Sequence, residues 1–313
     1  MDGEERGRLP VSGKKSVVAT MARLQSWVCG VAMCALGVGV FAPASASADG
    51  PEVRVRVFEF VDGTRTTTLP DGRRVLRKLE TIVRYPSTGG SHPLIVFAHG
   101  FALTPERYAS LLGAWAAAGY VVAAPVFPLT STNAPGGPTE ADLINQPRDM
   151  SFVITRLLAL SRRSTSVLDG EIDPTRIAVA GQSDGGVTAL AAAYDSRYRD
   201  RRVRAALILS GARLGGMGPF PQRGPPLLAV QGTADSLNTP GTTASFFALT
   251  ARPKFLLWLL GASHLPPYTY QQPQLGIVER ATIAFLDHYV KGRPLGPFER
   301  AAHTPVTRLV AEP

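Results

Sequence analysis

From residue 50 onward, short apolar runs rich in β-branched residues alternate with longer stretches of helical periodicity. The first two runs alternate apolar and polar residues, as in "VRVRVFEF", and suit antiparallel edge strands, whereas the later runs are continuously apolar, like parallel strands buried on both faces. This alternation predicts right-handed crossovers and one doubly wound, mostly parallel α/β sheet of eight strands. The expected strands are 53–60, 75–85, 94–98, 121–124, 176–181, 204–209, 227–231 and 255–260, and the expected helices are 105–118, 146–161, 185–193, 242–249 and 274–289.

The connection between the sixth and seventh expected strands is short. It reads "SGARLGGMGPFPQRGPP" (210–226), is rich in Gly and Pro, and is barely long enough for a crossover. No helical cap domain fits there, so we expect a site open to large or polymeric ligands. The segment 292–313 is polar and interrupted by prolines, and we expect it to pack loosely on the surface as a tail.

The first 48 residues differ in character from the rest. The apolar run 27–42 follows basic residues and precedes "ASASA" (44–48), which offers small-residue cleavage sites. The run is shorter than the ~20 residues of a spanning helix. We therefore expect 1–48 to be a cleaved signal peptide, 49–291 to form the folded domain, and the protein to be secreted or associated with the cell envelope without stable membrane insertion. A retained anchor is the alternative, and Met21 is an alternative start to Met1.

Cysteine content and charge narrow the function classes. Cys29 and Cys34 are the only cysteines and lie inside the apolar run, so the exported chain would lack disulfides, thiol catalysis and Cys-based metal sites. The net charge is +9, and the basic cluster 196–204 is read as a solvated face, with adsorption to an anionic surface as the alternative. The sequence contains no stretch in which aromatic and basic residues alternate and no recognisable nucleic-acid-binding motif. We therefore do not expect the protein to bind nucleic acid.

A serine stands at a glycine-flanked corner in "RIAVAGQSDGG" (176–186). Residues 181–185 fit G-x-S-x-G between an expected strand and an expected helix, the context in which a sharp turn exposes a nucleophilic serine. Gly181 and Gly185 let the strand and the helix approach each other, and the turn lifts the Ser183 hydroxyl above the sheet. An ordinary Gly-rich turn is the alternative.

A serine hydroxyl needs a base, and the base needs a carboxylate. Of the five histidines, only His264 directly follows a strongly apolar strand, and it thus falls at the same sheet edge as Ser183. Asp235 follows another buried strand, and the chain order Ser183, Asp235, His264 is the order in hydrolases built on this kind of elbow. The rival Asp184 neighbours the nucleophile and is expected to point away as a helix N-terminal acid.

Attack on a carbonyl makes an oxyanion, which backbone N–H groups can stabilise. The residue after the nucleophile, Asp184, is expected to supply one donor. The loop "FAHGFALTP" (97–105) is expected to supply the other from Phe101, with Gly100 allowing the backbone to come close; a plain strand-to-helix turn is the alternative. His99 is expected to be structural, with its side chain turned into the loop.

These motifs resemble the α/β-hydrolase superfamily, within it the dienelactone-hydrolase-like group and especially secreted cutinase-like polyester hydrolases. The resemblance rests on "HGFALTPERYASLLGAWAAAGYVVAAP", "DPTRIAVAGQSDGG", "PPLLAVQGTAD" and "LLGASHLPP" and covers about 94–291. It implies the roles assigned above: Ser183 as nucleophile, Asp235 as acid, His264 as base. Polyester hydrolases usually carry Met where this chain has Asp184, and relatives that cleave lipid or chlorophyll esters match equally well.

The sequence therefore predicts a serine hydrolase that cleaves short-chain, lipid or polyester carboxylic esters through an acyl-enzyme. No metal or organic cofactor is implied, and the expected partner is a small or polymeric ester. An acyltransferase or a serine peptidase on the same three residues, or a catalytically retired binding protein, are the alternatives. The acyl and alcohol groups and the oligomeric state stay open.

Overall fold

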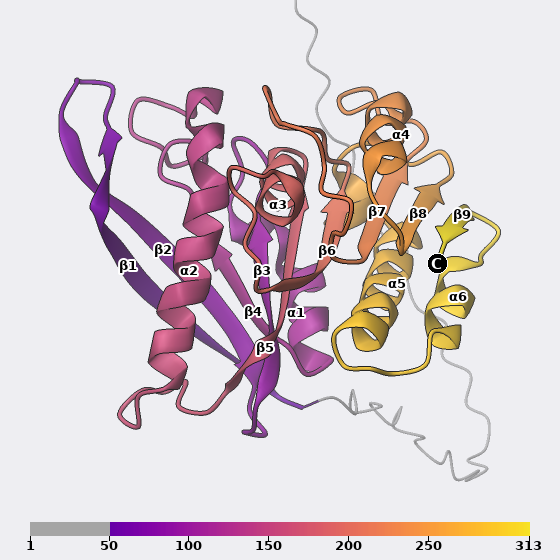
Figure 1. Cartoon of the computed structure of the whole chain (residues 1–313), viewed down its shortest axis with the longest axis horizontal. Helices are drawn as coiled ribbons and strands as arrows, with labels where there is room; N and C mark the ends of the chain where they lie inside the picture. The colour runs from indigo at the N-terminus through magenta and orange to yellow at the C-terminus, as the bar shows by residue number, and fades with distance from the viewer. Residues whose placement is uncertain (1–50) are drawn as a thin grey trace, which may run out of the picture. The chain divides into compact units, whose positions relative to one another are not determined.

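The computed structural model describes residues 51–313, and the predicted signal peptide (1–48) lies outside them. The described residues form one nine-stranded sheet in the order β1-β2-β4-β3-β5-β6-β7-β8-β9 (Figure 1). The strands are β1 (Val53–Thr68), β2 (Arg74–Pro86), β3 (His92–Ala98), β4 (Val121–Pro125), β5 (Ile172–Gln182), β6 (Val203–Leu209), β7 (Leu227–Gly232), β8 (Lys254–Leu259) and β9 (Thr307–Glu312). The helices are α1 (Ala109–Ala117), α2 (Gln146–Ser161), α3 (Asp184–Tyr194), α4 (Pro240–Leu249), α5 (Gln274–Tyr289) and α6 (Gly296–Ala302), with short 3₁₀ helices η1 (Pro105–Tyr108), η2 (Glu140–Asn145) and η3 (Pro266–Tyr268).

The sheet is mixed but mostly parallel. Strands β4, β3, β5, β6, β7 and β8 run parallel to one another, whereas β1 and β2 form an antiparallel hairpin at one edge. The doubly wound α/β-hydrolase-type fold expected from the sequence is confirmed, and the alternating pattern of "VRVRVFEF" does mark the outermost strand.

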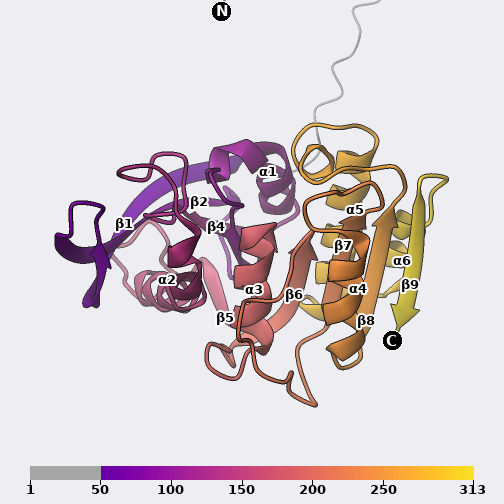
Figure 2. The same cartoon turned by 90° about the horizontal axis from the view of Figure 1, so that it is seen from above.

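Helices cover both faces of the sheet, as the view in Figure 2 shows. Residues of α2, α3 and α4 pack in one apolar core, and residues of α1, α5 and α6 pack in the other. Neighbouring residues of β3 alternate between the two cores: Val96 belongs to the first, Ile95 and Phe97 to the second. Strands that bury both faces need apolar residues at every position, which explains their continuous apolar sequence.

The order of the strands reverses beside β3, and this reversal positions the site. The chain passes from β3 outward to β4, then returns to β5 on the other side of β3. The loops that leave the carboxyl ends of β3 and β5 therefore diverge, and the crevice between them is where ligands bind in sheets of this kind. Ser183 directly follows β5, and Gly100 and Phe101 lie two and three residues after the end of β3.

The C-terminal segment corrects one expectation. Residues 292–313 do not form a loose tail, because they contain α6 and β9, and β9 pairs antiparallel with β8 from Thr307 to Glu312. The sheet thus has nine strands, not eight. The segment looks polar because an edge strand buries little of its surface, but Phe298 and Ala302 of α6 are fully buried in the core.

The connection between β6 and β7 lies close to α3. The segment between β6 and β7 contains no helix among the described residues, and it crosses α3 closely enough for the buried Tyr194 hydroxyl to donate to the Pro225 carbonyl at 2.6 Å.

Within residues 51–313, no helix is long and apolar enough to cross a membrane.

Candidate active site

The corner between β5 and α3 holds Ser183 in an unusual backbone conformation. Its φ of 58° and ψ of −123° lie in a region that non-glycine residues rarely occupy. Strain of this kind costs about 1–3 kcal/mol and persists only where the surroundings enforce it. Here the Ser183 N–H donates to the Leu209 carbonyl of β6 at 2.9 Å, which ties the corner to the neighbouring strand.

Two glycines of the motif are required by close backbone approach. A Cβ at Gly185 would overlap the carbonyl group of Ala98, at the end of β3, and a Cβ at Gly181 would overlap the carbonyl group of Gly185. Helix α3 therefore sits against the ends of β3 and β5 at a distance that only glycine permits. This approach aims the start of α3 at the loop that follows β3.

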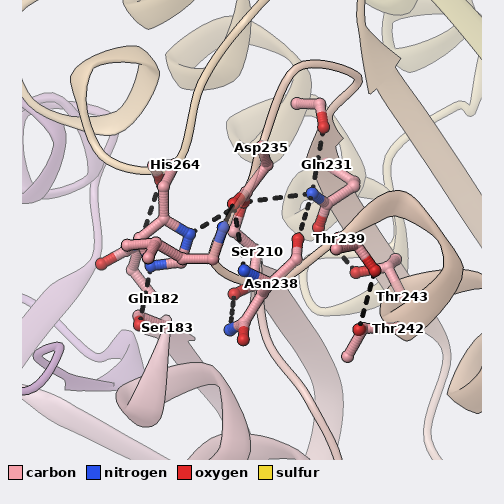
Figure 3. Close-up of polar contacts among 12 residues, drawn as sticks. Gln182, Ser183, Ser210, Gln231, Asp235, Asn238, Thr239, Thr242, Thr243 and His264 are labelled. Carbon is pink, nitrogen blue, oxygen red and sulfur yellow. Dashed lines mark hydrogen bonds and ion pairs between the residues drawn. The ribbon is translucent and has the colours of Figure 1, made fainter.

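His264 joins Ser183 and Asp235 in a line of hydrogen bonds (Figure 3). Its Nε2 lies 2.8 Å from the Ser183 Oγ, and its Nδ1 lies 2.8 Å from Asp235 Oδ2. Because a carboxylate accepts hydrogen bonds only, Nδ1 carries the ring proton and Nε2 is free to accept from the serine hydroxyl. The structure thus brings together the three side chains that the sequence predicted.

Asp235 is buried, with 3% of its surface exposed, and its carboxylate oxygens accept hydrogen bonds from several donors. Oδ1 accepts from the backbone N–H groups of Leu237 and Asn238 at 2.9 and 3.0 Å, and Oδ2 accepts from Gln231 Nε2 at 3.1 Å as well as from His264. A tight turn of backbone donors thus holds the carboxylate in place.

Side chains outside the predicted set brace this turn (Figure 3). Asn238 Nδ2 donates to the Ser210 carbonyl at 2.6 Å, and Thr243 Oγ1 donates to Gln231 Oε1 at 2.7 Å. These contacts tie the Asp235 turn to the end of β6 and to α4. Sequence reasoning missed them; the only available signal was a polar Gln231 at the end of an otherwise apolar strand.

The loop after β3 presents its backbone to the serine. Within residues 51–313, neither the Phe101 N–H nor the Asp184 N–H has a hydrogen-bond acceptor, and both residues line the cleft beside Ser183. The two N–H groups that the sequence predicted as oxyanion donors therefore border the same cleft as the serine. A Cβ at Gly100 would stand 2.9 Å from Gln182 Oε1, so this loop position also needs glycine.

His99 braces the same loop from behind, as expected. It is 1% exposed, its Nε2 accepts from the Phe127 N–H at 3.1 Å, and its Nδ1 therefore donates to the Gly100 carbonyl at 2.8 Å. Burial lowers the pKa of His99 to about 4, so the ring is neutral at physiological pH and keeps this tautomer.

A family model described as Chlorophyllase matches residues 70–242. The chain belongs to the chlorophyllase family. The match includes Ser183 and Asp235 and ends before His264. Membership confirms the expected superfamily and makes the chain an ester hydrolase of the α/β-hydrolase type. The comparison with curated proteins yields no match.

In this chlorophyllase-family chain, a buried chain of hydrogen bonds links the loop after β3, which holds the predicted oxyanion donor Phe101, to the loop that holds His264. The Gly100 N–H donates to the Tyr108 hydroxyl at 3.2 Å, and Tyr108 donates to Gln182 Oε1 at 2.7 Å. Gln182 Nε2 then donates to the His264 carbonyl at 3.0 Å. Gln182 is the variable residue before the serine in G-x-S-x-G, so the motif itself gave no signal for this role.

A cleft of about 600 Å³ opens above Ser183 and His264. Its apolar wall includes Phe101, Leu103, Leu237 and Leu265, and its polar wall includes Glu140 and Asp184. Asp184 begins α3, as expected, and it is one of the residues that line the cleft. The pKa of Asp184 is raised to about 6, mainly by burial and to a smaller extent by the nearby charge of Glu140. The nearby His264 lowers this pKa.

The remaining histidines lie apart from this cleft. His288 and His303 contact backbone carbonyls near α5 and α6, and His92 lies 3.8 Å from Glu171 at the start of β3. Among residues 51–313, no three His, Cys, Asp or Glu side chains gather closely enough to hold a metal ion.

Proposed function

We propose that this chlorophyllase-family protein hydrolyses carboxylic esters through an acyl-enzyme on Ser183. The single observation that carries the proposal is the line of two 2.8 Å contacts from the Ser183 Oγ through His264 to Asp235. A hydroxyl is a weak nucleophile at neutral pH, and a neutral imidazole at this distance can take its proton as the hydroxyl attacks.

The first half of the reaction uses each group in turn. Ser183 Oγ forms a bond to the ester carbonyl carbon while its proton moves to His264 Nε2. The carbonyl oxygen becomes an oxyanion, which the N–H groups of Phe101 and Asp184 stabilise. The intermediate collapses, the carbon–oxygen bond to the alcohol breaks, and His264 returns the proton to the leaving alcohol.

The second half repeats these steps with water. Water loses a proton to His264 Nε2 and attacks the acyl carbon on Ser183. The second intermediate then collapses, the bond from that carbon to Ser183 Oγ breaks, and His264 returns the proton to Oγ, which releases the acid and restores the hydroxyl. The imidazolium form of His264 arises twice in the cycle. The buried Asp235 carboxylate 2.8 Å away stabilises that cation and fixes the ring tautomer.

The residues that line the cleft favour binding of neutral esters with an apolar acyl or alcohol group. Phe101, Leu103 and Leu265 offer an apolar wall beside the serine, and Leu237 remains 73% exposed at the rim. Short-chain esters, lipid esters and accessible polyester ends all present such groups. The family name adds chlorophyll, itself an ester, as a substrate to be tried.

The experiment compares wild type with Ser183→Ala on nitrophenyl esters, a triacylglycerol, polyester films and chlorophyll, and labels both proteins with a fluorophosphonate. We expect labelling of the wild type alone and a loss of at least about 10³-fold in kcat/KM in the variant. Equal rates in the two proteins would refute the role of Ser183. Transfer to an added alcohol in preference to water would make the protein an acyltransferase, and amide turnover matching ester turnover would make it a peptidase.

We also propose that the protein is exported. The proposal rests on the basic residues, apolar run and small-residue segment within 1–48. N-terminal sequencing of protein recovered from the medium or cell envelope should find a start near residue 49. Protein that stays in the cell with Met1 or Met21 as its first residue would contradict export.

A further inference from the structure

Two acidic residues line the Ser183 cleft, and they come from separate segments. Asp184 directly follows the serine at the start of α3, and Glu140 begins η2, 44 positions earlier in the chain. The residues that line the cleft include no Arg and no Lys. The described part of the cleft therefore carries negative charge without a balancing cation, apart from the proton that His264 takes up during catalysis.

The partly buried Asp184 differs from the two buried carboxylates of α2 and η2. Asp142 and Asp149 are both paired with the guanidinium of Arg77. Asp184, in contrast, has no salt bridge within residues 51–313, and its Oδ2 is buried without a hydrogen-bond partner there. A buried carboxylate oxygen without a partner is costly, so a function beside the serine is a better explanation than a contribution to stability.

The segment that carries the second acidic residue is anchored to the rest of the protein. Glu140 is exposed, but it begins η2, where Thr139 Oγ1 accepts from the Ala141 N–H at 3.4 Å. Two residues further on, Asp142 anchors η2 to the buried Arg77 through hydrogen bonds of 2.9 and 2.8 Å. The charge of Glu140 is therefore presented to the cleft by a segment tied to the sheet.

We propose that Asp184 and Glu140 make this cleft selective for uncharged or cationic esters and exclude esters that carry an anionic group near the scissile bond. This inference rests on the proposed ester hydrolysis at Ser183. Charges interact over about 8 Å in physiological salt, and both acidic residues line the same cleft as Ser183. The same repulsion acts on the carboxylate product and favours its release.

The acidity of Asp184 fits this role. Its pKa of about 6 leaves it ionised at neutral pH, while mild acid removes the charge. The charged and titratable groups that affect it are Glu140, which opposes its ionisation, and His264, which favours it. The selectivity should therefore weaken below about pH 6, and ratios of rates measured at the same pH show this change separately from any change in overall activity.

The test uses three butyrate esters of similar shape. Butyrylcholine carries a positive charge, 3,3-dimethylbutyl butyrate is its neutral isostere, and 2-sulfoethyl butyrate carries a negative charge. Hydrolysis is followed at pH 7.5 by titration of the released acid. In wild type we expect kcat/KM for the cationic ester to exceed that for the anionic ester by at least about 10-fold, the effect of a unit charge across a partly hydrated cleft.

Variants of Asp184 and Glu140 test whether these two residues cause the charge selectivity. Asp184→Asn keeps the backbone N–H and should lower the cation-to-anion ratio several-fold, and the double variant with Glu140→Gln should bring it close to one. Glu140→Gln alone should also lower the ratio, which keeps the test decisive if Asp184→Asn folds poorly. Glu59→Gln removes an exposed carboxylate of the β1 edge and should leave the ratio unchanged.

Salt provides an independent reading, because added sodium chloride should lower the wild-type ratio and leave the double variant unaffected. A ratio near one in wild type, or an unchanged ratio in the double variant, would overturn the selectivity while leaving the proposed hydrolysis intact. Hydrolysis of the neutral ester by Ser183→Ala at the wild-type rate would instead overturn the proposed function.

Discussion

The Oγ of Ser183 lies 2.8 Å from Nε2 of His264, although 81 positions separate the two residues in the chain. The contact exists because β5 and β8 run parallel in one sheet and both residues follow the carboxyl ends of their strands. The side chains and backbone groups around this contact can each be tested by substitution.

Asp235→Asn tests the role of the charge behind the histidine. An amide of the same shape can present its NH₂ group to Nδ1, which favours the ring tautomer with its proton on Nε2, and it cannot stabilise the imidazolium. We expect kcat to fall by about 10³–10⁴-fold, with the protein still folded. Ester hydrolysis and circular dichroism measure the two effects, and a variant within 10-fold of wild type would show that the carboxylate is not needed.

Tyr108→Phe tests the hydrogen-bond chain between the two site loops. Loss of the hydroxyl leaves the Gly100 N–H and Gln182 Oε1 without their partner, which should cost about 1–3 kcal/mol of unfolding free energy. Movement of the oxyanion loop should also lower kcat by about 10- to 100-fold. Urea unfolding and steady-state kinetics give the two readouts.

The matched control is Tyr194→Phe, because this hydroxyl is also fully buried and donates to a backbone carbonyl, that of Pro225. It should cost comparable stability and leave kcat unchanged. If both variants lower kcat equally, the effect of Tyr108 is one of general stability and the positioning role is wrong.

Gly185→Ala tests the close approach of α3 to β3. A methyl group there overlaps the Ala98 carbonyl group, so we expect a loss of about 3 kcal/mol or more of unfolding free energy and of most of the activity. Gly113→Ala makes the same change inside α1, where nothing lies within 4 Å of the added Cβ. That variant should gain about 0.5–1 kcal/mol. Similar stabilities for the two variants would contradict the packing at the elbow.

Asp184→Asn tests how much the negative charge of Asp184 lowers the free energy of unfolding. The pKa of Asp184 is raised from 3.8 to about 6, so the folded protein holds this proton more tightly than the unfolded chain. The associated stability is present at low pH and is lost as the pH rises from about 4 to about 6. The Asn variant should therefore exceed wild type by about 1–2 kcal/mol at pH 7, after discounting for partial exposure, and match it near pH 4.

Urea unfolding at both pH values measures this difference, with Glu59→Gln as a control that should change stability little at either pH. A variant that is less stable than wild type at pH 7 would show that the Asp184 carboxylate is stabilising and would contradict the assigned direction.

The positions of most strands and helices followed from local patterns. Continuous apolar runs such as 94–98 can serve only a strand buried on both faces, and the sequence around Ser183 requires a strand, a sharp corner and a helix. Residues 292–313 were misjudged because an edge strand and a short helix carry little periodic signal. Their place depends on pairing with β8 and on packing of Phe298 in the core.

The sequence by itself determined the alternation of strands and helices, the elbow at Ser183 and the identity of its two partners. These depend on local periodicity, on glycine spacing and on the rule that parallel strands end at one edge. Only the tertiary structure decided that Tyr108 and Gln182 connect the two site loops, and that Glu140 and Asp184 line the same cleft. Such contacts join side chains distant in sequence, and their geometry is set by the packing of whole elements, which no local pattern records.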